Sequence, residues 1–316
     1  MSARAWIAFA SVSVLWGIPY LFIKVAVDDG VPPVFLAWVR VVLAAAVLLA
    51  LAWRAGQLGS LRGQWRWITV YAVIEICIPF PLIGFGEQRV SSSLAAILIA
   101  AVPLLVALMA MRFDSGERAH GRRLVGLIVG FAGVVALVGL DVAGRPGELV
   151  GAGAILLAAA GYAAGPMVLK RHLVHVSPVP LMGAATAAAA VVLTPAALLV
   201  PPAEMPSSEA LGAILTLGLL CTAMAFVLFG ALNAEVGPGR ATVITYVAPV
   251  VAVALGVAVL GERPGAGAVA GLLLIIAGSW LSTDGRLPPG LAATASRLRP
   301  RGPAQRVAES GEVRAA

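Results

Sequence analysis

The sequence predicts an all-α integral membrane protein with ten transmembrane helices, arranged as two inverted five-helix repeats. Two observations lead to this prediction. Hydrophobic residues make up 60% of the chain and charged residues only 12%, with a mean hydropathy of +0.98, whereas a soluble globular domain carries roughly 25% charged residues. The chain also repeats itself, and its only lysines, Lys24 and Lys170, lie at matching points of the two copies.

The membrane-spanning elements follow from the lengths of the apolar stretches. A helix needs about 20 mostly apolar residues to cross a bilayer, and ten stretches meet this requirement. Each one ends where charged residues, glycine or proline begin a connection, and the strand alternation of a transmembrane barrel is absent. In chain order the stretches are Ala5–Val27, Pro32–Trp53, Trp67–Phe85, Ser92–Met111, Leu124–Leu140, Leu149–Leu169, Pro178–Val200, Ala210–Ala231, Arg240–Leu260 and Gly265–Ser282.

The two copies match at a nearly constant offset. We expect the first repeat to cover residues 5–140 and the second to cover residues 148–283. Because each copy holds five spans, an odd number, the second copy is expected to lie upside down relative to the first. The matched residues are Trp16 with Tyr162, Pro103 with Pro249, Gly116-Glu117 with Gly261-Glu262, and Gly126-Leu127 with Gly271-Leu272.

Arginine distribution predicts the orientation. With the N-terminus inside, the inner connections and the tail hold most of the basic residues, and the outer ends hold only Lys24, Arg89, Arg145 and Arg263. Positive charge favours the cytoplasmic side, so we expect both termini in the cytoplasm. Residues 284–316 are rich in proline and arginine and lack aromatic residues, which predicts a disordered basic cytoplasmic tail. No soluble basic domain that would bind nucleic acid is expected.

The motifs resemble those of the EamA-type permeases of the drug/metabolite transporter superfamily. The matching features are Trp16-Gly17 with Lys24, Arg40 in the second stretch, the paired prolines and the two Gly-Glu pairs, and they cover about Ala5 to Ser282. The resemblance implies a central cavity, alternating access, and export or uptake of small metabolites, often amino acids or related compounds. The second copy departs from the pattern, since Thr186 replaces Arg40, so the site need not be symmetric.

Glu75 is the most informative candidate for substrate or proton binding. It lies near the middle of the third stretch, where a carboxylate is expensive and normally faces a cavity or a partner. Its repeat equivalent is Cys221, so the scaffold does not require the charge. Burial favours the neutral acid, which fits proton exchange, while the ionised form would bind an amine. Arg40 fits a substrate carboxylate, and an ion pair between Arg40 and Glu75 is the structural alternative.

Further candidates lie on the first and sixth stretches. Helical spacing places Trp16, Tyr20 and Lys24 on one face, and we predict that Trp16 and Tyr20 contact substrate. Lys24 and Lys170 end their stretches and are candidates for gates at the two mouths. The alternative for both lysines is that their ammonium groups extend to lipid headgroups.

Prolines mark the fourth and ninth stretches. Pro103 and Pro249 each remove a backbone donor and free a carbonyl about one turn earlier, so we predict helix breaks that line the cavity. Thr242, Thr245 and Tyr246 lie near Pro249 and are predicted to contact substrate. The alternative is a simple kink with hydroxyl groups bonded to their own helix.

Glycines form small faces on the fifth and tenth stretches. Such faces allow close helix contact, so we expect the two stretches to pack against each other or against a second protomer, as a homodimer. The glycines are Gly126, Gly130, Gly133, Gly267, Gly271 and Gly278.

The sequence therefore predicts a secondary transporter for a small metabolite in the cytoplasmic membrane, with proton-coupled export of an amino acid or a related amphipathic compound as one form. A sugar or nucleotide-sugar carrier, a channel and a non-transporting membrane adaptor are the alternatives. The sequence has no Gly-x4-Gly-Lys-[Ser/Thr] phosphate-binding loop and no Gly-x-Ser-x-Gly motif, so neither ATP hydrolysis nor enzyme activity is expected. We expect no metal and no cofactor.

Overall fold

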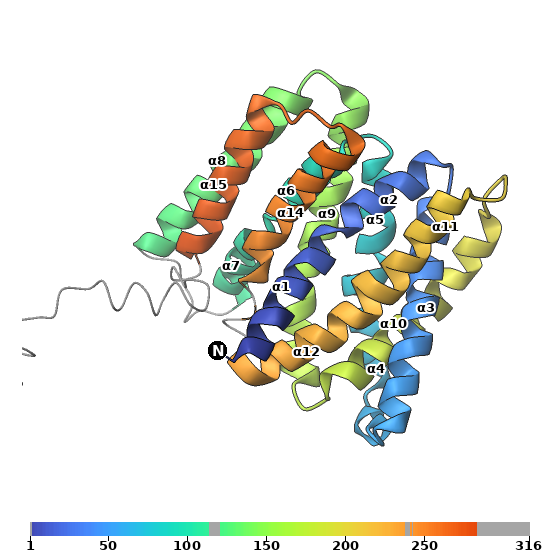
Figure 1. Ribbon diagram of the computed structural model, residues 1–316. Helices are drawn as coiled ribbons and strands as arrows, with labels where there is room; N and C mark the ends of the chain where they lie inside the picture. Colours follow the sequence, from blue (N-terminus) through green and yellow to red (C-terminus); the bar gives the residue numbers. More distant parts are fainter. Residues whose placement is uncertain (1, 114–120, 238–240, 242, 283–316) are drawn as a thin grey trace, which may run out of the picture.

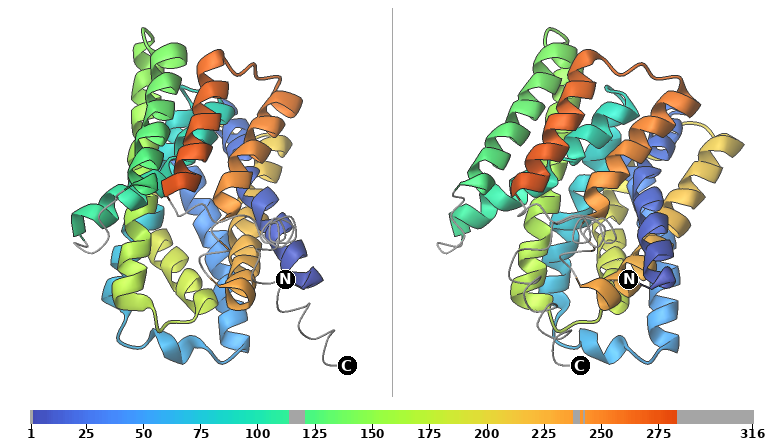
Figure 2. Two further views of the ribbon diagram at one scale, coloured as in Figure 1. Left: turned by 90° about the vertical axis from the view of Figure 1, so that its left-hand side faces the viewer. Right: turned by 60° about the vertical axis from the view of Figure 1, so that its left-hand side comes forward.

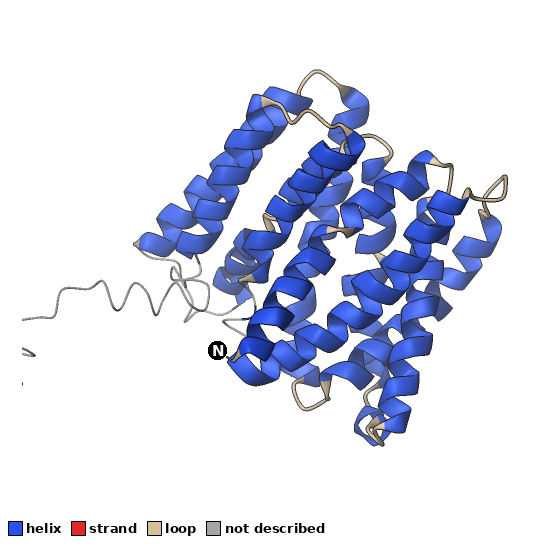
Figure 3. Cartoon of the chain, in the orientation of Figure 1, coloured by secondary structure: helices blue, strands red, loops and turns tan. Residues whose placement is uncertain are grey.

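A computed structural model describes residues 2–113, 121–237, 241 and 243–282 of the chain, and the regular elements within them are all helical (Figure 3). Eight helical segments are long and apolar enough to cross a membrane, and two shorter apolar helices follow them. The all-α prediction is therefore confirmed. The predicted tail, residues 284–316, lies outside the described residues.

The helices follow the order of the predicted apolar stretches (Figure 1). In the first half they are α1 (Ala3–Gly17), α2 (Pro19–Asp28), α3 (Pro33–Arg54), η1 (Leu58–Leu61), α4 (Trp65–Ala72), η2 (Val73–Cys77), α5 (Pro79–Glu87), α6 (Ser92–Ile99), α7 (Val102–Phe113), α8 (Arg122–Leu137) and η3 (Val138–Val142). In the second half they are α9 (Pro146–Val168), η4 (Leu169–Leu173), α10 (Pro178–Leu199), α11 (Ser208–Leu215), η5 (Thr216–Met224), α12 (Ala225–Val236), α14 (Ile244–Leu260) and α15 (Ala266–Ser282).

Proline interrupts the first and the fourth of the predicted stretches. The first divides between α1 and α2, where Pro19 begins the new helix, and this break was not predicted. The fourth divides between α6 and α7, just before Pro103. Proline suits the start of a helix because no partner is needed for its missing N–H there. By contrast, α14 continues through Pro249, which corrects the break predicted at that residue, since packed transmembrane helices tolerate an internal proline.

Wide π-helical turns interrupt the third and eighth stretches at equivalent places. The turn η2 joins α4 to α5 and contains Glu75, whereas η5 joins α11 to α12 and contains Cys221. Glu75 and Cys221 are repeat equivalents, so both copies have the same irregularity. A π turn rotates the following residues relative to a regular helix and is common at functional sites.

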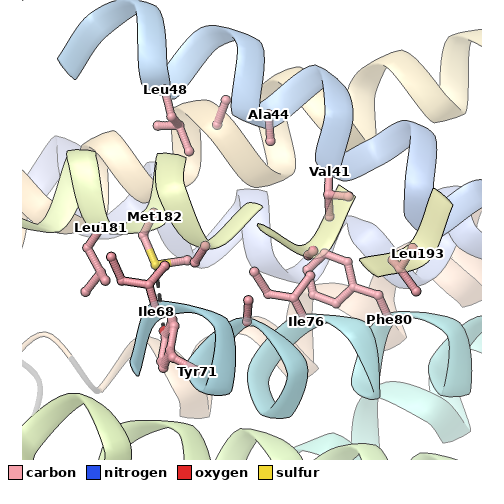
Figure 4. Packing of buried hydrophobic residues seen from close by; sticks show 14 of the residues in the cluster. Val41, Ala44, Leu48, Ile68, Tyr71, Ile76, Phe80, Leu181, Met182 and Leu193 are labelled. Atoms are coloured by element: carbon pink, nitrogen blue, oxygen red, sulfur yellow. Dashed lines mark hydrogen bonds between the residues drawn. The ribbon is translucent and has the colours of Figure 1, made fainter. Parts of the chain in front are cut away.

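The largest packed cluster joins α3, α10 and the α4–η2–α5 segment (Figure 4). Val41 and Leu48 of α3 face this cluster together with Phe80, and the Tyr71 hydroxyl donates a hydrogen bond to Met182 Sδ at 3.7 Å. In lipid the hydrophobic effect does not drive helices together, so close van der Waals packing of this kind supplies the association.

The glycine faces of α8 and α15 pack directly against each other (Figures 1 and 2). A β-carbon added at Gly278 would collide with the backbone of Gly126 and Gly130, and one added at Gly133 would meet the backbone of Gly271. The structure therefore has the first of the two expected arrangements. A homodimer through the same helices stays a prediction.

The contacts of a helix in one half match the contacts of its equivalent in the other half. Helix α1 packs against α12 and α14, and its equivalent α9 packs against α5 and α6. The two most extensive contacts, α8 with α15 and α3 with α10, join equivalent helices of the two halves. This pattern brings residues of both halves to the centre of the molecule.

The outer surface of the bundle is apolar, as the side chains Leu199, Val191 and Val135 illustrate with exposed fractions of 82%, 74% and 70%. Trp53, near the end of α3, and Trp65, at the start of α4, are exposed. Tryptophan is enriched where a membrane meets water. The chain is thus a multi-pass membrane protein.

Candidate functional site

A cavity of about 300 Å³ lies between the two halves. The broken and π-helical segments contribute lining residues together with the continuous helices α3, α9 and α14. Its lining residues are Trp16, Pro19, Tyr20, Ile23, Arg40, Glu75, Ile76, Phe80, Ile83, Ile99, Ala100 and Val102 from the first half, and Tyr162, Pro166, Cys221, Phe226, Thr245, Ala248 and Pro249 from the second.

Arg40 is the cation of this cavity, and its side chain is only 8% exposed. Its Nε donates a hydrogen bond to Thr222 Oγ1 at 2.8 Å, and its guanidinium carbon lies 4.0 Å from the centre of the Phe80 ring. Among the described residues, Thr222 is the sole hydrogen-bond partner of this guanidinium. The terminal nitrogens therefore stay available to a carboxylate in the cavity, which an arginine binds in paired fashion.

Thr222 is a positioning residue that the sequence analysis missed. The η5 turn places its hydroxyl so that it donates to the backbone oxygen of Leu217 at 2.7 Å while it accepts from Arg40. The sequence carries a signal, since a hydroxyl residue next to Cys221 lies at the repeat equivalent of the Glu75 region. That signal names a position but not its partner, which lies on another helix.

Glu75 is the carboxylate of the cavity. Its Oε2 is buried and has no hydrogen-bond partner in the described part of the chain, and it packs against Gly165 of α9 so closely that a β-carbon there would collide with the carboxylate. The described residues contain no ion pair between Arg40 and Glu75, although both line the cavity. The structure therefore does not have the alternative arrangement, in which an ion pair between Arg40 and Glu75 only holds two spans together.

Aromatic rings complete the walls. Trp16, Tyr20 and Tyr162 all line the cavity, and the ring of Trp16 lies 5.9 Å from Phe226 and 4.8 Å from Phe229, measured between ring centres. Rings of this kind attract a substrate ammonium group and also cover an apolar side chain. The cavity thus offers one cation, one acid and a mainly apolar surround.

The model of the EamA-like transporter family matches residues 4–139 and, separately, residues 149–283. The chain belongs to this family. Each match covers one of the two related halves.

Several known proteins are similar to this EamA-like transporter. PagO of Salmonella typhimurium is 36% identical over 135 residues, which are 42% of this chain and 43% of PagO. The uncharacterized inner membrane transporter YedA of Escherichia coli is 30% identical over 267 residues, or 81% of this chain and 82% of YedA. A probable amino-acid metabolite efflux pump of Escherichia coli is 24% identical over 90% of this chain and 96% of that protein.

One solved crystal structure has a TM-score of 0.65 to this EamA-like transporter at 22% identity, and the match covers 90% of this chain and 98% of that one. At this identity the likeness shows the fold alone.

Of the site residues predicted in the ninth stretch, some line the cavity and others do not. Thr245 and Pro249 line the cavity. Tyr246 does not, because its hydroxyl donates to the backbone oxygen of Ser279 on α15 at 3.3 Å. Thr242 lies outside the described residues. On the opposite side Pro103 is not a lining residue, whereas its neighbour Val102 is.

The two candidate gate lysines of this EamA-like transporter differ. Lys24 Nζ donates to Asp28 Oδ1 at 2.8 Å and to the backbone oxygen of Glu87 at 2.9 Å, so it joins α2 to α5. Lys170 is exposed in η4. In the described part of the chain no three His, Cys, Asp or Glu side chains gather closely enough to hold a metal ion.

Proposed function

We propose that this protein is a secondary transporter that moves a small metabolite with an amine and a carboxylate, such as an amino acid, across the cytoplasmic membrane. One observation carries the proposal: within the described residues, a central cavity holds an anchored guanidinium with open terminal nitrogens and a carboxylate without a hydrogen-bond partner. Arg40 would bind the substrate carboxylate, and Glu75 would bind the ammonium group. The aromatic walls would cover the substrate side chain.

The pairing of two opposite charges favours a zwitterion over a sugar. A neutral sugar would leave both buried charges without a charged partner, and such unpaired charges are costly in a water-poor cavity. A zwitterion supplies both counter-charges at once. The relative whose printed name is an amino-acid metabolite efflux pump supports the same substrate class.

Alternating access by two inverted five-helix repeats is the mechanism that we propose. Three observations support it: the family model matches each half separately, the helix contacts exchange when the halves are interchanged, and the π turns η2 and η5 lie at equivalent places. Related halves that surround one site can rock about it, so that each side opens in turn. We place both termini in the cytoplasm.

Counterflow in liposomes tests the function. Purified protein would be reconstituted with unlabelled substrate inside, and uptake of labelled amino acids, monoamines, monocarboxylates and sugars would be compared. We expect exchange of amino acids and none of sugars. Flux far above carrier rates without counterflow would indicate a channel, and counterflow with sugars alone would reject the substrate class.

Two variants assign the charges. Arg40→Gln should weaken recognition of carboxylates and Glu75→Gln recognition of amines, each by about 10- to 100-fold, because a buried charged hydrogen bond contributes about 1.5–3 kcal/mol. Glu148→Gln is the matched control, since this acid pairs with Arg145 at 3.0 Å on the surface. Equal losses for amines and carboxylates in both variants would contradict the assignment.

A further inference from the structure

Glu87, the last residue of α5, is a buried acid that the cavity chemistry does not use. Its side chain is 0% exposed, and neither carboxylate oxygen has a hydrogen-bond partner among the residues that the structure describes. It follows Ile83 by one helical turn, and Ile83 lines the cavity. Glu87 therefore lies just beyond the cavity, at the end of the bundle where α2 and α5 terminate, which we call the Lys24 end.

The nearest ammonium group is bonded elsewhere. Lys24 donates to Asp28 Oδ1 at 2.8 Å and to the backbone oxygen of Glu87 at 2.9 Å, rather than to the Glu87 carboxylate. An ionised carboxylate without a hydrogen bond or a direct counter-charge is strongly unfavourable in a protein interior. This arrangement accommodates the neutral acid.

Charged groups from three neighbouring segments interact with Glu87. Helix α2 contributes Lys24 and Asp28, α3 contributes Arg40, and the connection after α14 contributes Glu262. Glu262 is itself held at the start of α6, where it accepts hydrogen bonds from the backbone nitrogens of Ser92 and Ser93 at 2.7 and 3.0 Å. Its fixed negative charge opposes a second ionised acid nearby.

In the described part of the chain, the remaining ionisable side chains near Glu87 are two tyrosines and one arginine, and none of them donates a hydrogen bond to its carboxylate. Tyr20 of α2 interacts with Glu87, while Tyr162 of α9 interacts with Arg40 and Glu75 at the cavity. Arg89 lies two residues after Glu87. It donates to the backbone oxygen of Phe85 at 2.8 Å and stacks on the Phe85 ring. Helix α6 carries no ionisable side chain.

We propose that Glu87 is a proton-binding site and that its protonation closes the Lys24 end of the transporter. When α2 separates from α5, water reaches the carboxyl group, which gives its proton to water and leaves a carboxylate and a hydronium ion. Closure reverses this step, because the carboxylate must take a proton from a hydronium ion, which leaves water, before it is buried. The inference rests on the proposed transport function, and it names the coupling ion as a proton.

Hydrogen–deuterium exchange of the full chain in lipid nanodiscs tests the site without any substrate. Protection of the segment 84–95 would be followed from about pH 6 to about pH 9 and corrected for intrinsic chemical exchange. If one proton controls opening, protection should fall about tenfold per pH unit above the titration midpoint. Glu87→Gln, which cannot ionise, should change less than about twofold. The segment 178–199 in α10 is the internal control.

A second variant guards against loss of folding. Glu87→Met replaces the neutral acid by an apolar chain of similar length, and we expect it to stay folded with pH-independent protection. A flat wild-type profile, or an unchanged pH dependence in a folded Glu87 variant, would overturn the proposal. Protection that follows sodium concentration at constant pH, rather than pH, would identify a metal-cation site and overturn it as well.

A transport measurement separates this inference from the proposed function. Wild-type counterflow at equal pH tests transport alone. Uptake driven by a pH gradient then tests coupling, and we expect accumulation in the wild type and at least a tenfold loss in Glu87→Gln. Absence of counterflow with pH-dependent protection intact would reject the substrate proposal alone. Gradient-driven accumulation that persists in Glu87→Gln would reject Glu87 as the coupling site.

Discussion

Arg40 and Thr222 join the two halves of this protein through one buried hydrogen bond, with Nε and Oγ1 2.8 Å apart and the two residues 182 positions apart in the chain. The bond fixes the guanidinium from one edge, and Phe80 supports one face of its plane. An arginine held in this way loses little freedom when it binds a carboxylate, which is the advantage of preorganisation.

Removal of the Thr222 hydroxyl should therefore weaken carboxylate binding without removing the charge. We expect Thr222→Val to raise the apparent KM of a carboxylate substrate by about 10-fold or more, since a hydrogen bond to a charged group contributes about 1.5–3 kcal/mol. Thr222→Ser should restore most of the affinity. Initial rates of liposome uptake measure both effects.

Thr216→Val is the matched control for this prediction. Thr216 begins the same η5 turn, but its hydroxyl is exposed and donates only to the backbone oxygen of Gly212 at 2.8 Å. A KM change in Thr216→Val as large as that in Thr222→Val would mean that the turn, rather than the bond to Arg40, sets the affinity.

Position 165 should tolerate only glycine. A methyl group there would collide with the Glu75 carboxylate, so Gly165→Ala is expected to displace the acid and lower amine-dependent counterflow by about 10-fold or more. Gly153→Ala on the same helix meets open space and should transport normally. Equal activity of the two variants would show that the Glu75 position does not matter.

Stability should depend on the glycines between α8 and α15. Gly278→Val places carbon atoms against the backbone of Gly126 and Gly130, and overpacking of this kind typically costs about 1–3 kcal/mol or more. We expect a lower melting temperature in detergent. Gly139→Val, with open space around it, should melt like the wild type, and a similar loss in both variants would point to valine itself.

Cysteine labelling tests the orientation. Gln57 lies in the connection after α3 and Glu204 in the connection after α10, and both are exposed. An impermeant thiol reagent added to intact cells should label Glu204→Cys, whereas Gln57→Cys should react only after the membrane is opened. Both positions labelled from outside would contradict the proposed arrangement of the two halves.

The sequence was sufficient to predict the apolar helices, because these depend on local hydropathy. Arg40 and Glu75 stand out as charges within apolar stretches, and the structure places both at the cavity. Tyr246 was predicted to join them for its position near Pro249, yet its hydroxyl donates to Ser279 instead. A position on a helix face does not specify which neighbour occupies that face.

By itself, then, the sequence determined that the chain is helical, apolar and duplicated, since each of these properties is carried by residues close together or aligned at a fixed offset. Only the tertiary structure decided that Arg40 bonds to Thr222 and not to Glu75, and that the buried Glu87 carboxylate has no hydrogen-bond partner among the described residues. Those facts depend on π turns and helix breaks that rotate side chains toward other helices, and a rotation of this kind leaves no periodic trace in the sequence.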